Sequence, residues 1–279
     1  MASMDPMDGT SRALTPPSSK PRLDPYQRPP EGIRSVYKKF QKMDRKTLDS
    51  NTQIIDFSNF SVDKANVLSV ASSFERKELL SHFQAFSGNP VEDHLEESLV
   101  HMYEHRDIPG LFIIPSLLPP STQTTLLSRL LHTHLSNPSH LTNLHTHYTL
   151  SYPPTSTSFF SLPPTEPKAP QTIATPHDPT LHRPLPLTPL LTRKLRWLTL
   201  GGQYNWTTKT YPSLPPPPFP ADIKQLLESL FPETKSEAAI VNLYSPGDTL
   251  SLHRDVAESC GRGLVSVSLG CEAVFVIGD

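Results

Sequence analysis

The sequence is poor in cysteine, in long apolar runs and in excess charge of either sign. Two cysteines among 279 residues cannot build a disulfide scaffold, which excludes a small secreted knot and favours a reducing, intracellular compartment. The longest apolar runs, 110–114 and 273–277, are far too short to span a bilayer. With 25 Lys and Arg against 27 Asp and Glu, the formal net charge is −2, so no global basic field marks a nucleic-acid binder.

The first residues also lack a targeting signal. Residues 1–11 contain neither an apolar stretch nor an Arg-rich amphipathic pattern, so we expect no signal or transit peptide. The nucleus, the cytoplasm or both are the expected location, and no membrane association is expected.

Proline, by contrast, is abundant, and it divides the chain. Its 32 copies make up about 11% of the residues, against a usual value of about 5%. Residues 1–30 carry too few large apolar side chains to offset chain entropy, so we expect a disordered tail. Eleven prolines between 151 and 190 predict an extended surface insertion, because neither a sheet interior nor a long helix tolerates that density.

Residues 31–46 form a basic segment with the pattern of a helix. Six Lys and Arg stand against Glu31 and Asp44, which gives a local net charge of +4. Two interpretations remain open: contact with nucleic-acid phosphates, or a solvated helix face. The stretch that follows alternates short apolar and charged runs, so we expect 31–106 as a whole to be a helical N-terminal extension.

The pattern changes after Ile108. The apolar run 111–114 predicts a short strand, and a second helix is predicted between Pro220 and Pro232. Between these two elements, an amphipathic helix should begin at Ser121 as its N-cap and carry an apolar stripe. That stripe is formed by Leu127, Leu130, Leu131 and Leu135.

From Ala238 onward the hydrophobic period switches to two, which is typical of strands. Asn242 and Tyr244 share one face of the first predicted strand, and a turn is predicted at 245–248. Further strands are predicted at 265–269 and 273–277.

His253 and Asp255 are the first candidates for metal ligands. The two residues lie in an alternating segment after the predicted turn. On a strand, residues two apart point the same way, so the imidazole nitrogen and the carboxylate oxygen could ligate one metal ion.

Other constellations compete with this pair. Residues 105–107 repeat the letters His-Arg-Asp without the alternation, and His101 with His105 would have zinc-site spacing on a helix. Histidines between 132 and 147 lack a fixed ligand spacing. Cys260 and Cys271 have no CxxC partner and are most simply a thiol in a loop and a small residue in a strand region.

Aromatic side chains gather at Trp197, Tyr204 and Trp206, in a segment that contains two glycines. Exposed rings there could stack on an unstacked base. Packing beneath a loop is the alternative.

Residues 240–277 resemble the AlkB family of iron(II)- and 2-oxoglutarate-dependent dioxygenases. The pattern is Asn-x-Tyr, a Pro-Gly turn, Leu-x-x-His-x-Asp, Val-Ser-Val-Ser-Leu-Gly and an apolar strand. Segments 196–206 and 55–58 are more weakly similar to the eukaryotic branch typified by AlkB homologue 1. The resemblance implies an α+β fold, in which 107–279 forms a partial double-stranded β-helix, or jelly roll, with flanking helices.

The resemblance also implies the positions of the ligands. His253 and Asp255 match two Fe(II) ligands of a facial triad. Asn242 and Tyr244 match residues that hydrogen-bond the carboxylates of 2-oxoglutarate, and Ser266 matches a position lining the same pocket.

The implied activity is oxidative demethylation of N-methylated nucleobases in tRNA, mRNA or DNA, with Fe(II) as cofactor, 2-oxoglutarate as cosubstrate and O₂ as oxidant. Trp197 and Tyr204 fall where the family places the aromatic residues of its substrate lid. The resemblance thus favours base stacking as their role.

The sequence departs from the family pattern after the ligand pair. The family needs a third ligand, a downstream His, and two Arg that hold the cosubstrate. Residues 256–279 contain no His, and their one Arg, Arg262, is in the wrong place. We therefore expect a C-terminally truncated form that binds Fe(II) weakly. The alternative is a non-catalytic fragment of such an enzyme that binds nucleic acid or a partner.

Overall fold

The computed structural model describes residues 24, 26–57, 67–88, 99–163, 171–205, 213, 215–255 and 263–278. The predicted disordered tail, 1–30, lies almost entirely outside these residues. The helical elements, with 3₁₀ or π turns marked η, are α1 (Glu31–Gln41), α2 (Arg45–Asp49), η2 (Arg76–Leu79), α3 (Leu80–Ser87), α4 (Pro120–Ser128), η4 (Arg129–His134), η5 (Asn143–Thr146), η6 (Phe159–Ser161), α5 (Leu187–Pro189), η7 (Leu190–Lys194) and α6 (Ala221–Leu230). The strands are β1 (Leu68–Glu75), β2 (Leu99–His105), β3 (Phe112–Ile113), β4 (Tyr148–Leu150), β5 (Thr172–Pro176), β6 (Leu185–Pro186), β7 (Trp197–Gly201) and β8 (Ala238–Asn242).

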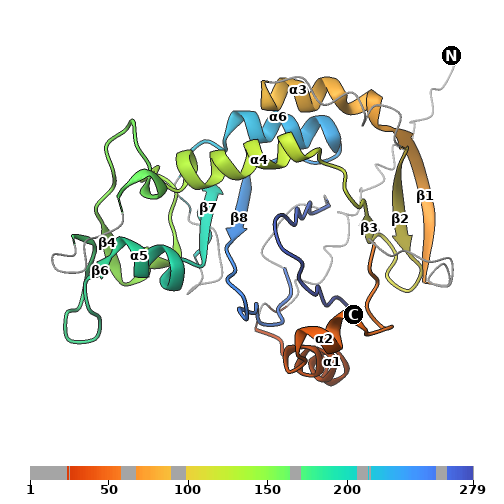
Figure 1. Cartoon of the computed structure of the whole chain (residues 1–279), viewed down its shortest axis with the longest axis horizontal. Helices are drawn as coiled ribbons and strands as arrows, with labels where there is room; N and C mark the ends of the chain where they lie inside the picture. The colour runs from red at the N-terminus through yellow and green to blue at the C-terminus, as the bar shows by residue number, and fades with distance from the viewer. Residues whose placement is uncertain are drawn as a thin grey trace, which may run out of the picture.

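The strands pair into three antiparallel sheets within the described ranges. Their orders are β1-β2-β3, β4-β5-β6 and β7-β8. Figure 1 shows α3, α4 and α6 together along one side, with β7-β8 between the other two sheets. The α+β class is therefore confirmed, while the described strands stay in separate sheets and do not close into a barrel.

One hydrophobic core joins the helical layer to the central sheet. It contains Phe83 of α3, Leu126 of α4 and Leu226 of α6, all buried, together with Leu198 and Leu200 of β7. The two leucines of β7 are 0% and 1% exposed. Since burying a leucine stabilises a fold by roughly 1.5–3 kcal/mol, these residues hold β7 firmly under the helices.

The predicted helical extension at 31–106 is wrong at 68–75 and at 99–105, where the chain forms strands. β1 and β2 pair antiparallel, with Phe74 opposite Val100, and the predicted strand at 111–114 is confirmed as β3 on the other edge of β2. Most side chains of β1 are exposed, so the strand lacks the apolar alternation that would have revealed it. Its backbone hydrogen bonds come from a partner about thirty residues away.

The basic helix is interrupted. α1 ends at Gln41, and α2 begins after Asp44, whose side chain accepts a hydrogen bond from Thr47 N at 2.9 Å. The backbone and side-chain hydrogen bonds from Thr47 lower the pKa of Asp44. An N-cap residue needs non-helical backbone, so the predicted continuous helix 31–46 is two helices.

The next predicted helix is confirmed with a different start. α4 has Pro119 as its N-cap and Pro120 in its first turn, so Ser121 lies inside the helix. The prolines suit this place because the first turn leaves its N–H groups without helical partners. The helix continues as the π-helical η4, and the prediction between Pro220 and Pro232 is confirmed by α6.

The proline-rich segment 151–190 is not purely a surface insertion. Phe159, Ile173, Ala174 and Leu187 are all at most 5% exposed and belong to the core. Prolines exclude long regular elements but leave the apolar residues between them free to anchor the chain. The segment therefore contributes short strands and turns that cover one end of the fold.

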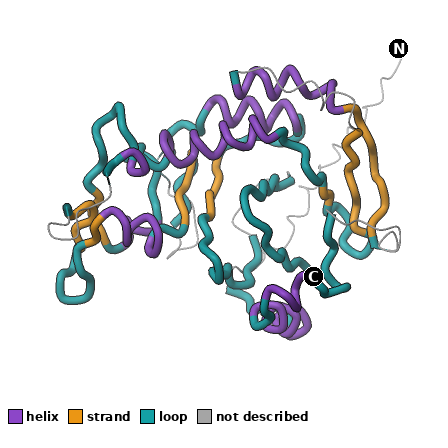
Figure 2. Tube along the Cα trace, in the orientation of Figure 1, coloured by secondary structure: helices purple, strands orange, loops and turns teal. Residues whose placement is uncertain are grey.

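The strands predicted at 265–269 and 273–277 are not formed. Figure 2 shows the chain after β8 as loop, and Leu264 and Phe275 are 74% and 77% exposed. A strand needs the N–H and C=O groups of a neighbour, and in the described part of the chain no strand pairs with these residues.

Candidate functional site

The β7-β8 pair brings two of the predicted site residues together. Trp197 lies directly opposite Asn242, and Leu198 lies opposite Val241. Alternation then places Leu198 on the core face and the side chains of Trp197 and Asn242 together on the other face. Trp197 is half-buried and Asn242 is exposed. A proposed substrate residue and a proposed cosubstrate residue are thus cross-strand neighbours.

Asn143 holds the start of β7 in place. Its Oδ1 accepts hydrogen bonds from Arg196 N at 2.8 Å and Trp197 N at 3.3 Å, and its Nδ2 donates to Lys194 O at 2.8 Å. One amide group therefore satisfies three backbone groups beside Trp197. No sequence pattern marks Asn143, because its partners lie more than 50 residues away.

The loop that leads to Tyr204 is held by Gln203. Its Oε1 accepts hydrogen bonds from Leu141 N at 3.0 Å and from the hydroxyl of Thr199. Its Nε2 donates to Gly201 O at 2.7 Å. Tyr204 itself is half-buried, and Trp206 lies outside the described residues. The hydrogen bonds of the Gln203 side chain therefore fix the centre of the aromatic segment.

The turn after β8 is confirmed. Asp248 N donates to Ser245 O at 2.9 Å across Pro246 and Gly247, and Gly247 has φ of +87°, as a type II turn requires. The carboxylate of Asp248 accepts from Ser245 N at 2.6 Å and from Arg196 Nη1 at 2.9 Å. The ion pair ties this turn to the start of β7.

Asn242 and Tyr244 remain available to a ligand. Both are exposed, and within the described chain neither side chain has a hydrogen-bond partner. Partial burial raises the pKa of Tyr244, so its phenol stays protonated and can donate a hydrogen bond at neutral pH. β8 ends at Asn242, and the backbone ladder continues one step as Leu243 N donates to Arg196 O at 2.8 Å.

His253 and Asp255 converge although the strand predicted for them is absent. The segment is loop, yet His253 Nε2 lies 3.6 Å from Asp255 Oδ1. His253 Nδ1 lies 2.8 Å from Ser251 O, an acceptor that requires the proton on Nδ1. This leaves the lone pair on Nε2, the nitrogen beside the carboxylate, which is the arrangement that a metal-binding histidine needs.

The donor set fits part of a metal centre. The side chains of His253 and Asp255 are 47% and 58% exposed, so an ion can reach both. Among the described residues, no group of three or more His, Cys, Asp or Glu could hold a metal ion. His and Asp side chains suit Fe(II), and this pair offers one nitrogen and one carboxylate donor.

The remaining predicted residue, Ser266, is exposed on the loop after the ligand pair. No hydrogen bond or ion pair between described residues joins Ser266, Asn242 or Tyr244 to His253 or Asp255. The structure thus forms two local pairs, Trp197 with Asn242 and His253 with Asp255.

The alternative zinc site at His101 and His105 is excluded. Both lie on β2 rather than a helix, so four residues of strand separate them by about 13 Å. His101 Nδ1 lies 2.7 Å from Ser73 Oγ, and His105 Nδ1 accepts from Asp107 N at 3.2 Å.

The histidines between 132 and 147 are structural where they are buried. His134 and His140 are 8% and 3% exposed, with ring centroids 5.3 Å apart. His145 Nε2 lies 3.0 Å from the hydroxyl of Tyr152, and burial raises the pKa of Tyr152 to about 12. These contacts explain the cluster as packing.

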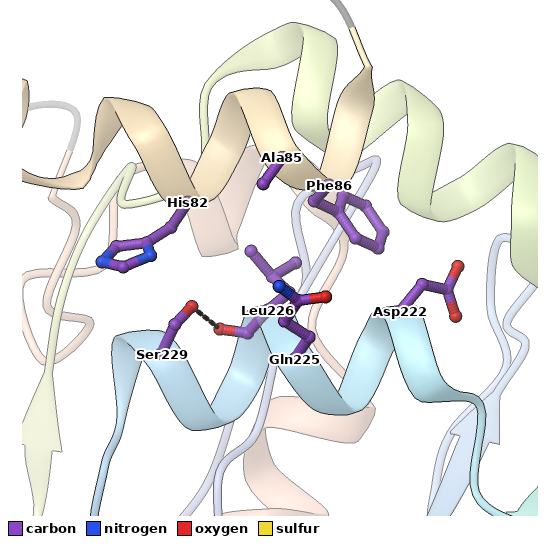
Figure 3. A pocket seen from close by; sticks show the side chains of 7 residues that line it. All are labelled: His82, Ala85, Phe86, Asp222, Gln225, Leu226 and Ser229. Carbon is purple, nitrogen blue, oxygen red and sulfur yellow. Dashed lines mark hydrogen bonds between the residues drawn. The ribbon is translucent and has the colours of Figure 1, made fainter.

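The small cavity between α3 and α6 belongs to none of these groups. Figure 3 shows His82 and Phe86 of α3 facing Leu226 and Ser229 of α6 across it. None of the proposed site residues lines the cavity.

Within the described residues, no helix is both long and apolar enough to cross a membrane.

Comparison with known proteins supports the family suggested by the sequence. Residues 165–279 match the 2OG-Fe(II) oxygenase superfamily. The N6-methyladenosine RNA demethylase ALKB1 of Pyricularia oryzae is 41% identical over 91% of this chain and 73% of its own length. This chain belongs to the AlkB family, in the branch of AlkB homologue 1.

Other AlkB relatives cover different shares of the chain. The tRNA demethylase abh1 of Schizosaccharomyces pombe is 35% identical over 66% of this AlkB chain and 62% of its own length. The nucleic acid dioxygenase ALKBH1 of Homo sapiens is 38% identical over 32% of the chain and 24% of its own length. The chain thus spans between about a quarter and three quarters of these relatives.

Proposed function

We propose that this chain is an Fe(II)- and 2-oxoglutarate-dependent demethylase of N-methylated nucleobases in RNA, such as tRNA, or in DNA. Membership of the 2OG-Fe(II) oxygenase superfamily supports the cofactor and cosubstrate. Relatives named as RNA, tRNA and DNA demethylases support the substrate class.

The observation that carries the proposal is the convergence of His253 and Asp255. The hydrogen bond from Nδ1 to Ser251 O orients the imidazole so that Nε2 lies 3.6 Å from the carboxylate. Two donors at that separation can bind one ion between them. In this proposal they hold Fe(II), which together with 2-oxoglutarate and O₂ supplies the oxidation that removes the methyl group as formaldehyde.

The other residues bind the organic partners. Asn242 and the protonated Tyr244 donate hydrogen bonds to the carboxylates of 2-oxoglutarate, and Ser266 lines the same pocket. Trp197, on the same face of the sheet as Asn242, stacks on the extruded base together with Tyr204. The proximity of Trp197 and Asn242 would bring substrate and cosubstrate to one face of the β7-β8 pair, and the pocket would be complete once 265–269 joins the sheet as in a jelly roll.

The alternative function is non-catalytic binding of nucleic acid or of a partner. It is favoured by one observation: among the described residues, no group of three or more His, Cys, Asp or Glu could hold a metal ion. Incomplete coordination lowers metal affinity.

Metal binding tests the ligand pair. In an anaerobic titration of the 279-residue chain with Mn²⁺, followed by electron paramagnetic resonance, we expect His253→Ala to weaken binding at least about tenfold, because it removes one of two ligands. His101→Ala is the matched control, since His101 is a strand histidine with a hydroxyl partner. Equal affinity of the His253→Ala and unmodified chains would refute the ligand assignment.

Turnover separates the two functions. The chain is incubated with Fe(II), 2-oxoglutarate and RNA or DNA 20-mers that carry one N-methylated adenine, and formaldehyde is measured. Formaldehyde from the unmodified chain and none from His253→Ala supports the demethylase. Binding of the same oligonucleotides without any formaldehyde would overturn it in favour of the non-catalytic alternative.

A further inference from the structure

Three lysines on α1, on α2 and between them form a basic surface that the proposed site does not use. Lys38 lies on α1, Lys42 is the C-cap residue that follows it, and Lys46 lies on α2. All three are exposed, and we call them the lysine face. In the described part of the chain none of the three has an acidic partner within ion-pair distance. Two neighbouring basic residues do have side-chain partners. Lys39 donates a hydrogen bond to Gln53 at 2.5 Å, and Arg45 lies 3.8 Å from Asp49.

α1 and the segment before it contact the loop of the proposed iron ligands. Gln41 Nε2 donates to Thr249 Oγ1 at 3.2 Å. Arg254, the residue between the two ligands, donates to Gln27 Oε1 at 3.1 Å. Figure 1 shows α1 and α2 beside the C-terminal end of the chain. The basic surface and the ligand pair therefore belong to one contiguous region.

The other side of α1 is already occupied. Ile33, Tyr37 and Phe40 form its apolar stripe and are half-buried. Ile33 packs closely on Gly278, because a Cβ atom added at Gly278 would lie 3.3 Å from Ile33 Cδ1. A helix that lies in a membrane surface must bury its apolar stripe in lipid, so this packing favours a partner that binds the charged side alone.

The charge distribution points to a polyanion. The chain has a formal net charge of −2, yet residues 31–46 carry +4, so the basic field is concentrated on this segment. Exposed lysines without acidic partners are the groups that release counterions when they meet phosphates. Lys38, Lys42 and Lys46 are spread over two consecutive helices and the turn between them, so they can meet successive phosphates of one strand.

We propose that the lysine face binds the phosphate backbone of the nucleic-acid strand whose base is presented to the site at His253 and Asp255. The proposal rests on the proposed function for the identity of the strand. It adds to the proposed function a phosphate-binding surface outside the β7-β8 pair. Lys38, Lys42 and Lys46 hold the strand without reading its sequence, since phosphate contacts position a nucleic acid and base contacts specify it.

The test is binding of a fluorescein-labelled, unmethylated single-stranded RNA 20-mer, measured by fluorescence anisotropy from 50 to 300 mM KCl without added iron. Each phosphate contact with a single strand contributes about 0.7 to the slope of log affinity against log salt. For Lys38→Ala/Lys42→Ala/Lys46→Ala we expect a slope smaller by about 2 and affinity about 100-fold lower at 0.1 M salt. The corresponding triple Arg variant should bind like the unmodified chain.

The matched control removes three lysines that lie outside α1, α2 and the turn between them. Lys77, Lys224 and Lys235 each have a Glu partner within 4 Å, and replacing them with Ala changes the net charge equally. We expect this variant to keep nearly all of its affinity. Equal losses in both triple variants would mean that only net charge matters and would overturn the proposal, as would an unchanged slope in the lysine-face variant.

Two further measurements make the outcome specific. Alanine favours helices at least as strongly as lysine, so far-UV circular dichroism should be unchanged. Sedimentation with phosphatidylcholine–phosphatidylserine vesicles tests the other polyanionic surface, and loss of vesicle binding with unchanged RNA binding would overturn the proposal. Because the RNA carries no methyl group and no iron is added, absence of formaldehyde in the turnover assay refutes the proposed function without affecting this result.

Discussion

Among the described glycines, Gly201 is the one at which an added methyl group should most destabilise the fold around the candidate site. It ends β7 opposite Ala238, with φ of +64°. A Cβ there would lie 2.2 Å from Glu237 O and 2.9 Å from Phe219 Cδ2. The next residue, Gly202, donates its N–H to the same Glu237 oxygen at 2.9 Å. Gly201→Ala must therefore separate β7 from the start of β8.

The magnitude follows from three contributions. The left-handed backbone costs an alanine about 1 kcal/mol relative to glycine. Moving Glu237 O out of contact costs the hydrogen bond from Gly202, about 1 kcal/mol, and about 1 kcal/mol more for disturbed packing around Phe219. We expect the free energy of unfolding to fall by about 3 kcal/mol. Gly88 provides a matched control, because its φ is +74° and an added Cβ meets nothing within 4 Å.

The assay is urea unfolding followed by tryptophan fluorescence. Both tryptophans, at 197 and 206, lie within five residues of Gly201, so the signal reports on this region. Gly88→Ala should lose only about 1 kcal/mol, from its backbone conformation. If Gly201→Ala lost no more than Gly88→Ala, the close approach of the two strands at Gly201 would be refuted.

Two further predictions concern the core around the site. The Arg129 guanidinium donates to the Asp222 carboxylate at 2.6 Å and to Phe86 O at 2.7 Å, and it lies 4.3 Å from the centre of the Phe86 ring. Arg129→Met should therefore lower the free energy of unfolding by about 2 kcal/mol. A loss below about 0.5 kcal/mol would contradict these contacts. Burial lowers the pKa of His134 and of His140, so the unfolded chain takes up protons first. The stabilisation is complete above the unfolded pKa of about 6.5 and is lost as the pH falls below it. In the His140→Gln variant, the thermal unfolding midpoint should therefore decrease less between pH 7 and pH 5 than in the unmodified chain. An equal decrease in both proteins would contradict a lowered pKa of His140 in the folded state.

Elements whose signal is local could be predicted from the sequence. The apolar residues Ile223 and Leu226 are spaced for one helix face, and both are buried in α6. The turn at 245–248 has Pro and Gly at the two positions where a type II turn needs them, and its hydrogen bond is formed. In each case a few adjacent residues contain all the information.

Elements that depend on distant partners could not be predicted in this way. β1 looks like a mixed polar segment because most of its side chains are exposed, and its backbone pairs with β2 across a long intervening stretch. The supporting residues Asn143 and Gln203 are ordinary amides by composition. Their importance comes from backbone groups of residues 196 and 141, which lie more than 50 positions away.

The candidate metal pair shows how these two kinds of information combine. The sequence predicts that His253 and Asp255 converge because alternate residues of a strand face the same way, but the segment is loop. The convergence comes instead from the contact between His253 Nδ1 and Ser251 O, which orients the ring within five residues of chain. Pairing of strands is therefore unnecessary for the two ligands to meet. Strand pairing enters only in the proposed function, where 265–269 would join the sheet and bring Ser266 and the candidate pair onto the face shared by Trp197 and Asn242.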